Sequence, residues 1–126
     1  MHGLLVRKPH LDRILAGEKT WEIRGCGTRR RGLIGLIQSR SGAVVGACRL
    51  VDSVGPLTLE QLNAHGRETC IGAASRLFYR RTHAWVLAGA RRLPEPVPYR
   101  HPPGAVIWVA LSPEVEARVR EQLGLA

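Results

Sequence analysis

The sequence predicts an α+β domain in which a small mixed β-barrel or curled sheet carries short flanking helices. Two observations predict it. Apolar β-type runs recur along the chain with short helical patterns between them, and 44% hydrophobic and 23% charged residues are typical of a globular protein. A length of 126 residues suits one core and is too short for two ordinary domains. We therefore expect a single domain spanning residues 1–126.

The first predicted elements are a strand and a helix. Gly3 to Val6 is a short apolar run, and the stretch PHLDRILAG after it repeats apolar residues at helical spacing, at Leu11, Ile14 and Leu15. Pro9 suits the first helical turn, where its missing N–H would have no partner in any case. Gly17 suits the position just past the helix end, where a left-handed backbone is needed.

A strand and an exposed loop are expected next. Thr20 to Arg24 alternates polar and apolar residues, and a period of two divides them between two faces: Thr20, Glu22 and Arg24 on one, Trp21 and Ile23 on the other. We expect Trp21 to face the core. The following GCGTRRRG is rich in glycine and charge, which predicts a mobile, exposed loop carrying Arg29, Arg30 and Arg31.

A hairpin and a second helix follow. Leu33 to Gln38 and Ala43 to Val51 are apolar runs separated by SRSG, a composition typical of a hairpin connection, so we expect these two strands to pair. Leu57 to His65 is expected to be helical, because Thr58 and Gln61 have the spacing of a capping box.

The second half of the chain predicts two more helices and further extended segments. Within Gly66 to Arg81, helical spacing is shown by Ile71, Ala74, Leu77 and Phe78. Ala84 to Ala88 and Ala105 to Leu111 are expected to be strands, and the proline-rich Pro94 to Tyr99 between them is expected to be extended. A last helix is expected from Pro113 to Leu123, with the preceding serine as its N-cap.

The charge indicates a polyanionic partner. Lys plus Arg is 19 against 10 for Asp plus Glu, which gives a net charge of +9 and a pI near 11.0. Such a balance is the electrostatic footprint of a domain that meets nucleic acid. Because all but Lys8 and Lys19 of these basic residues are arginines, genome composition can contribute to the bias. Nucleic acid is nevertheless the leading partner class, and a protein partner stays unknown.

The sequence gives little support for a disulfide-bonded, metal-binding, cofactor-binding or membrane protein. Cys26, Cys48 and Cys70 are an odd number without a CxxC pair, so we expect reduced thiols and neither a disulfide framework nor a zinc ribbon. The five histidines show no metal-ligand spacing and no triad pattern, which predicts no metal and no cofactor. The sequence lacks both an apolar run of roughly 18 residues and a signal peptide, so we expect no membrane partner and a cytoplasmic protein.

One segment carries a resemblance to a known family. GEKTWEIR, residues 17–24, matches the pattern GxKxxExR, the signature of the ASCH domain family. LLVRKPHLDRILAG resembles the family's opening strand and helix, VVGACRLVDSVGPLTLEQL its central strand and next helix, and HAWVLAGARRLPEPVPYRHPPGAVIWVAL its closing strands. The resemblance covers about Gly3 to Leu111 and implies a PUA-like β-barrel. It also implies recognition of nucleic acid or a nucleoside in a cleft beside the barrel, lined by Lys19, Glu22 and Arg24.

The resemblance also raises the question of catalysis. Some members of the family are acetylcytidine amidohydrolases that look as if they use the motif lysine and a threonine three residues later as nucleophile; this chain has Glu22 at that later position. Thr20 is adjacent to Lys19, and adjacent side chains of a regular strand point to opposite faces, so Thr20 would replace the lost threonine only on an irregular backbone. Other members are ribonucleases, whose sites do not map position by position onto this chain.

Each motif residue has a functional and a plainer interpretation. Arg24 is either a planar fork for a phosphate or base edge, or half of a surface ion pair. Glu22 repels phosphate, but it either accepts hydrogen bonds from an exocyclic amine such as cytosine N4 or serves as a counter-ion. Lys19 is a phosphate contact, a general base if burial lowers its pKa, or a solvated lysine.

Further candidates lie outside the centre of the motif. Lys8, at the entry of the first helix, is a weaker anion contact, and Thr20 shares the polar face of the motif strand. Tyr99 and His101 lie in a proline-bounded loop, where they either stack on a base or pack on proline. The loop arginines are either an arm that gathers phosphates or a solvated charge run: Arg29, Arg30 and Arg31.

Three functions therefore stay open at this stage. The first is a module that binds RNA or a nucleoside-containing ligand through Lys19, Glu22 and Arg24. The second is a hydrolase acting on a modified nucleoside or on RNA, with Lys19 as base and Glu22 polarising water or substrate. The third is a protein-interaction adaptor that keeps only the fold.

Overall fold

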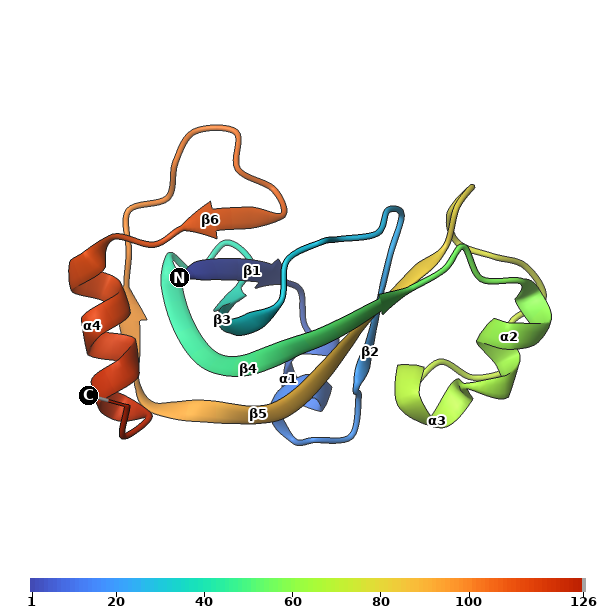
Figure 1. Cartoon of the computed structure of the whole chain (residues 1–126), viewed down its shortest axis with the longest axis horizontal. Helices are drawn as coiled ribbons and strands as arrows, with labels where there is room; N and C mark the ends of the chain where they lie inside the picture. The colour runs from blue at the N-terminus through green and yellow to red at the C-terminus, as the bar shows by residue number, and fades with distance from the viewer. Residues whose placement is uncertain (126) are drawn as a thin grey trace.

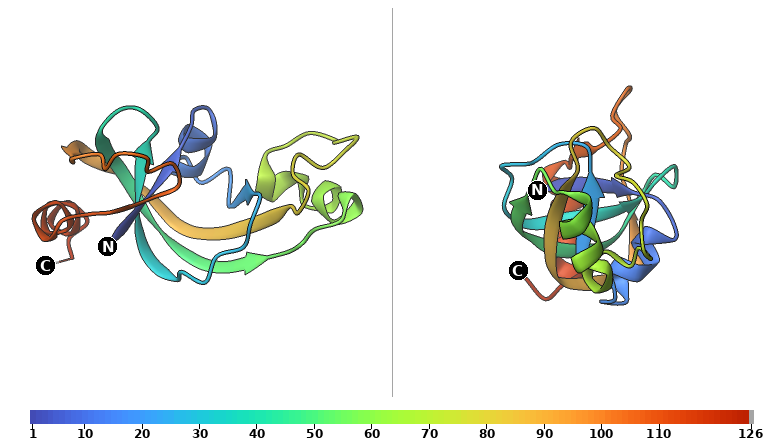
Figure 2. Two further views of the ribbon diagram at one scale, coloured as in Figure 1. Left: turned by 90° about the horizontal axis from the view of Figure 1, so that it is seen from above. Right: turned by 90° about the vertical axis from the view of Figure 1, so that its right-hand side faces the viewer.

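A curled sheet dominates the computed structural model, which describes residues 1–125. Within these residues, six strands form a half-barrel in the order β2-β5-β4-β3-β1-β6, flanked by short helices (Figure 1, Figure 2). The strands are β1 (His2–Val6), β2 (Trp21–Arg24), β3 (Gly32–Gln38), β4 (Ala43–Val54), β5 (His83–Pro98) and β6 (Trp108–Ala110). The helices are α1 (His10–Leu15), α2 (Leu59–Ala64), α3 (Gly66–Thr69) and α4 (Pro113–Gln122). The predicted α+β class with a small curled sheet is confirmed.

The pairing of β1 with β3 decides which loops meet. These two strands run parallel, with Val6 opposite Gln38, whereas the other neighbouring pairs of the sheet run antiparallel. Because parallel strands end at the same edge of a sheet, the residues that follow β1 and β3 lie close together. Arg7 and the Ser39–Gly42 turn are therefore neighbours, although they are far apart in the sequence.

Among the described residues, three apolar clusters form the core, and one of them, the α2 cluster, is built around Leu62 of α2 with Ile23, Leu57 and Ala84. The central cluster includes Leu4, Leu36, Leu50 and Trp85, each at most 1% exposed, and α1 packs onto it through Ile14. The second cluster lies under α4, where Val119 of the helix and its C-cap residue Leu123 are buried against β5 and its neighbours. In Figure 1, α4 covers one end of the curled sheet, and α2 and α3 lie at the other end.

The helix boundaries confirm several predictions. Gly17 takes a φ of +79° just past α1, as the left-handed position requires. Thr58 and Gln61 form both halves of the predicted capping box at the start of α2. Ser112 accepts a hydrogen bond from the Val115 backbone N–H and caps α4. The hairpin of β3 and β4 is also confirmed.

Three predicted elements differ from the structure. The helix expected over Gly66 to Arg81 stops at Thr69, because Cys70 takes a left-handed φ of +56°. Beyond it the backbone N–H and C=O of Ala74 bond the side chain of Asn63 instead of a helical neighbour, at 2.8 and 3.0 Å. The apolar residues of this stretch still pack on the α2 cluster: Ile71, Ala74 and Leu77.

The other two differences concern strands. The segments expected as Ala84 to Ala88 and Pro94 to Tyr99 belong, except for Tyr99, to one strand, β5, which pairs with β4 across three register shifts. Proline lacks only the N–H and fits extended backbone, so this strand tolerates its prolines beside such irregularities. The strand expected over Ala105 to Leu111 is shorter, because only Trp108 to Ala110 pairs with β1.

Two further observations concern the cysteines and the search for a membrane-spanning helix. Cys26, Cys48 and Cys70 are free thiols, and burial raises the pKa of the Cys48 thiol to about 12. Among residues 1–125, no helix combines the length and the apolar character that crossing a membrane requires.

Candidate ligand-binding site

An open cavity of about 1130 Å³ lies where the ends of β1 and β3 meet β2. Its walls come from five segments: the β1–α1 connection, the motif strand with Lys19, the β3–β4 turn, the stretch after α3, and the loop after β5. Lys19, Glu22 and Arg24 all line this cavity, as do Tyr99 and His101. The structure thus brings five of the predicted candidates to one place.

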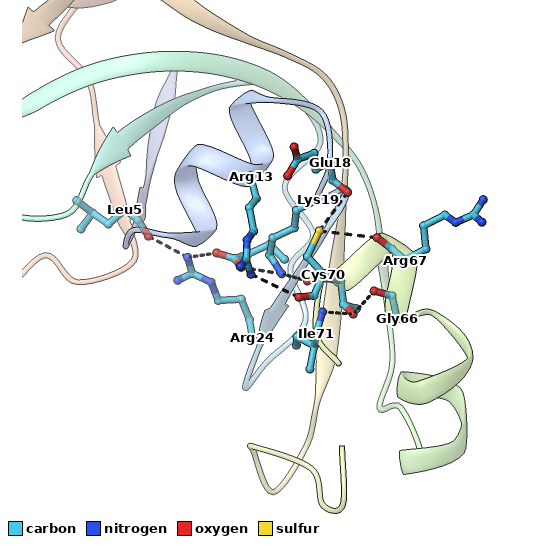
Figure 3. Close-up of polar contacts among 11 residues, drawn as sticks. Leu5, Arg13, Glu18, Lys19, Arg24, Gly66, Arg67, Cys70 and Ile71 are labelled. Atoms are coloured by element: carbon cyan, nitrogen blue, oxygen red, sulfur yellow. Dashed lines mark hydrogen bonds and ion pairs between the residues drawn. The ribbon is translucent and has the colours of Figure 1, made fainter. Parts of the chain in front are cut away.

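The three motif residues form a chain of charges at the cavity wall. Lys19 and Glu22 are 1% and 5% exposed. The Glu22 carboxylate lies between two cations, with Oε1 3.9 Å from Lys19 Nζ and Oε2 3.0 Å from an Arg24 nitrogen. Lys19 Nζ also donates to the Thr69 carbonyl oxygen over 2.6 Å. Figure 3 shows Lys19 and Arg24 converging on this centre from neighbouring stretches of chain.

Lys19 reaches Glu22 because it precedes the regular strand. The backbone N–H groups of Glu18 and Lys19 both donate to the Arg13 carbonyl, which turns the chain after α1, and β2 begins only at Trp21. The rule that residues three apart in a strand point to opposite faces therefore does not apply to Lys19. Within β2 itself, Glu22 and Arg24 share a face as their period of two predicts.

Arg24 is held at one end and free at the other. The nitrogen that meets Glu22 also donates to the Leu5 carbonyl oxygen over 2.8 Å. The guanidinium carbon lies 5.4 Å from the centroid of the Trp85 ring, in a cation–π arrangement. The other guanidinium N–H groups have no hydrogen-bond partner within residues 1–125, so they remain available to a ligand.

Burial changes the acid–base character of the site. Loss of solvation lowers the pKa of Lys19, and the nearby charges of Arg13 and Arg24 act in the same direction, whereas Glu22 opposes them. Burial likewise lowers the pKa of His10, which also lines the cavity. His10 Nδ1 is buried without a hydrogen-bond partner in the part of the chain that the structure describes. Neutral forms of both side chains are thus more accessible than in water.

Tyr99 and His101 form a hydrogen-bonded pair elsewhere in the cavity lining. His101 Nε2 lies 3.0 Å from the Ala105 carbonyl oxygen, which can only accept, so this nitrogen carries the proton. In the neutral ring Nδ1 is then an acceptor, and the Tyr99 hydroxyl donates to it over 2.8 Å. Burial raises the pKa of Tyr99. Tyr99 also packs on the second core cluster, so its ring is partly structural.

The remaining predicted candidates lie outside the cavity lining. The side chain of Lys8 is 55% exposed and 3.9 Å from Asp12. Thr20 contributes backbone hydrogen bonds to Glu68 and Leu87 instead of a cavity side chain. Lys8 and Thr20 are therefore not among the residues that line this cavity, and a ligand contact by either side chain stays a prediction.

The arginine loop also lies apart from the cavity, and its members differ. Arg29 and Arg31 are exposed, and Arg31 lies 3.7 Å from Asp52. Arg30 is half-buried instead, with its guanidinium carbon 4.8 Å from the centroid of the Trp108 ring. The expectation of an exposed loop thus holds at Arg29 and Arg31 and is wrong at Arg30.

The structure adds cavity residues that sequence reasoning missed: Arg7, His10, Arg40, Phe78 and Tyr79. Phe78 and Tyr79 are 58% and 44% exposed, which is unusual for neighbouring aromatic residues. The Tyr79 ring lies against Gly25, where an added Cβ would be 3.0 Å from it. A sequence signal existed for Arg7 and His10 in RKPH and for the two aromatic residues in FYRR, since each stretch combines basic residues with rings, but neither has the periodicity of a strand. Arg40 lies in neither stretch.

Comparison with known proteins identifies the fold. No family model matches the sequence, and no curated protein matches it either. Three crystal structures of an ASCH protein from Zymomonas mobilis are similar. This chain has the fold of an ASCH domain. The protein without a stated substitution superposes with a TM-score of 0.68 at 17% identity, over 98% of this chain and 92% of that one.

Two variants of the Zymomonas mobilis protein agree with this result. A tyrosine-to-phenylalanine variant gives a TM-score of 0.70 at 16% identity, covering 95% of this chain and 96% of that one. A serine-to-alanine variant gives 0.67 at 18% identity, covering 95% and 94%. At such low identity the likeness concerns the fold alone.

Proposed function

We propose that this chain is an ASCH-family protein that binds RNA or a nucleoside-type ligand in the cavity beside its sheet. The observation that carries the proposal is the Lys19–Glu22–Arg24 chain of charges, in which Lys19 and Glu22 are buried and Arg24 is partly buried, at the wall of that cavity. Buried charges are costly, and two of them beside a partly buried third at the wall of a cavity are a common feature of ligand sites.

The charge of the cavity favours an anion. Among the described residues that line it, four carry a positive charge (Arg7, Lys19, Arg24 and Arg40) and one carries a negative charge (Glu22), so the balance is +3 with histidine neutral. The whole chain has a charge of +9, which adds long-range attraction for a polyanion. Arginine side chains bind phosphate in two parallel hydrogen bonds, and this suits Arg7 and Arg40 at the rim.

Glu22, the one carboxylate among the described lining residues, favours a ligand group other than phosphate. Glu22 Oε1 is 3.9 Å from Lys19, which is too far for a hydrogen bond, so it has capacity to accept from a ligand. Beside it, Arg24 has unused N–H donors. An acceptor and donors side by side match the edge of a nucleobase such as cytosine, whose exocyclic amine donates and whose ring atoms accept.

Size and shape favour more than a single nucleoside. Cavities for drug-sized ligands are roughly 300–1000 Å³, and this one measures about 1130 Å³ and is open to solvent. The exposed rings of Phe78 and Tyr79 at its edge suit base stacking. A base at Glu22 and Arg24, with neighbouring phosphates at the rim, is the arrangement that we propose.

A second candidate function rests on Lys19. A lysine whose pKa is lowered by burial is able to act as a general base or nucleophile, and Lys19 lines the cavity. In this reading the protein is a hydrolase acting on an acylated nucleoside or on RNA. The threonine expected as nucleophile is absent, and Thr20 does not line the cavity.

One experiment separates the two functions. The purified protein is incubated with short RNAs and with acylated cytidines, and both binding and product are measured over a range of salt concentrations. We expect RNA affinity to fall steeply with salt, because phosphate contacts release counterions. Product formation that is lost in Lys19→Met would favour the hydrolase. Absence of any binding, or an affinity for RNA that is independent of salt, would contradict the proposed function.

A further inference from the structure

Two tryptophans connect the arginine loop to the candidate site. The rings of Trp85 and Trp108 are stacked, with their centroids 5.6 Å apart and an angle of 10° between their planes. Arg24 lies over the first ring at 5.4 Å, and Arg30 lies over the second at 4.8 Å. The four side chains form a continuous series of cation–π and stacking contacts, which we call the Arg–Trp series.

Arg30 is bound to this series by its flat face more than by its hydrogen bonds. One of its terminal nitrogens donates to His2 Nδ1 over 2.8 Å. Its Nε is buried without a hydrogen-bond partner among residues 1–125. A half-buried guanidinium that leaves a donor unpaired depends on the ring beneath it, and such contacts strengthen as water is excluded. His2 in turn meets the edge of Trp108, with ring planes at 89°.

The same loop also fixes the orientation of Trp85. This ring is 1% exposed, and its single N–H donates to the Cys26 carbonyl oxygen over 2.8 Å. The loop from Gly25 to Gly32 thus holds one tryptophan through a carbonyl and the other through Arg30. The loop is therefore held at Cys26 and at Arg30, and it is not a mobile arm at these two residues.

Arg24 needs such support because its polar anchors act on one nitrogen. Glu22 and the Leu5 carbonyl both accept from that nitrogen, so they leave the rest of the guanidinium able to swing about it. The face of Trp85, whose ring centroid lies 5.4 Å from the guanidinium carbon, limits this rotation while Arg24 lines the cavity. Any tilt of Trp85 would therefore move the donors that a ligand meets.

We propose that Arg30 is a positioning residue for Arg24, acting through the stacked Trp108 and Trp85, and that it takes no part in gathering phosphates. The inference rests on the proposed ligand-binding role of Arg24. It separates Arg30 from Arg29 and Arg31, which precede and follow it in the sequence but are exposed and have no part in the Arg–Trp series.

The neighbouring arginines supply matched controls. Arg30→Met, Arg29→Met and Arg31→Met each remove one positive charge from the same loop. The first readout needs no ligand: the side-chain Nε–H resonance of Arg24 in a nitrogen-edited NMR spectrum of the free protein. We expect this resonance to shift in Arg30→Met and to stay in place in the other two variants. An unmoved Arg24 resonance in Arg30→Met would overturn the proposal, whether or not RNA is the ligand.

The second readout is the affinity for a fluorescein-labelled oligocytidylate RNA. Arg30→Met is expected to weaken binding by about fivefold to tenfold with an unchanged salt slope, because a positioned contact and not a phosphate contact is impaired. Arg30→Lys should restore part of the affinity, since an ammonium also binds a ring face. Equal losses in all three methionine variants, each with a reduced salt slope, would show a plain electrostatic arm and contradict the proposal.

A second substitution guards against loss of folding. If Arg30→Met does not give a cooperative thermal transition, Trp108→Phe keeps a ring in the core while reducing the stacked surface. The Arg24 resonance is expected to move in this variant too. If it does not move in a folded Trp108→Phe protein, the tryptophan pair does not transmit position to Arg24, and the inference is wrong.

Discussion

Glu22 is the residue on which the charge balance of the site depends. It is almost fully buried between Lys19 and Arg24, so its removal leaves two cations without their shared partner. Breaking a buried ion pair from one side is far more costly than losing an exposed pair. The Glu22 carboxylate therefore affects both the stability of the fold and the proposed selectivity for a ligand.

We expect Glu22→Gln to lower the free energy of unfolding by about 3 kcal/mol, because the amide keeps the shape but not the charge. Urea unfolding monitored by circular dichroism measures the change. Asp12→Asn is the matched control, since Asp12 is half exposed and pairs with Lys8 and Arg92 only at the surface. Its loss should stay within about 0.5 kcal/mol. Equal losses in the two variants would mean that the Glu22 pairs are no stronger than surface pairs.

Among the secondary-structure elements, the position of α1 depends on Gly46 of β4, which has no side chain. A Cβ on Gly46 would lie 2.4 Å from Leu15 of α1 and 2.7 Å from the Arg91 carbonyl oxygen of β5. The second neighbour is backbone, so it cannot move aside cheaply. This close approach coincides with the register shift between β4 and β5 beside Val44. The position of α1 also fixes one side of the cavity, because the helix begins with the lining residue His10 and leads into the turn that carries Lys19.

Gly46→Ala is expected to destabilise the protein by about 1–3 kcal/mol through overpacking. Gly72→Ala is a suitable control, because nothing lies within 4 Å of its added Cβ. That substitution should be neutral or slightly stabilising, since it reduces the freedom of the unfolded chain. Chemical denaturation of both variants gives the comparison. A Gly46→Ala protein as stable as Gly72→Ala would show that α1 and β5 adjust freely.

The secondary-structure elements also show which helices and site residues could be predicted from the sequence. Local signals were sufficient for α1, α2 and α4, because proline, glycine and cap residues act on their immediate neighbours. Glu22 and Arg24 were placed together by strand periodicity alone. Arg7 and Arg40 could not be found in this way, because only the parallel pairing of β1 with β3 brings them together.

The largest error has a physical cause of the same kind. Of the apolar residues at helical spacing after Gly66, Ile71, Ala74 and Leu77 do pack inward and Phe78 does not. The side chain of Asn63 replaces helical hydrogen bonds there. Periodicity reports which side chains are buried and not which groups satisfy the backbone. The role of Arg30 was missed similarly, since no local pattern shows that Trp85 and Trp108 stack.

For the whole molecule, burial and charge act together on the acid side of the pH range. Burial lowers the pKa of His2 and His10 below the ordinary 6.5, and Arg30 adds to the effect on His2. Hydrogen bonds from the N-terminal ammonium and Arg120 lower the pKa of Glu116 below its ordinary 4.5. In each case the unfolded chain binds more protons than the folded one between the two pKa values. Stability is therefore lost as the pH falls, first through the histidine range and then through the carboxylate range.

We expect the thermal midpoint to fall progressively from about pH 6.5 downward, with the first part of the decline due to histidine burial. Differential scanning calorimetry between neutral and acidic pH measures it, and His10→Gln should flatten the upper part of the profile. Added salt separates this effect from self-repulsion of the +9 chain, because screening relieves repulsion but not the burial of an imidazole. A profile that salt removes entirely, with no change in His10→Gln, would assign the acid sensitivity to net charge alone.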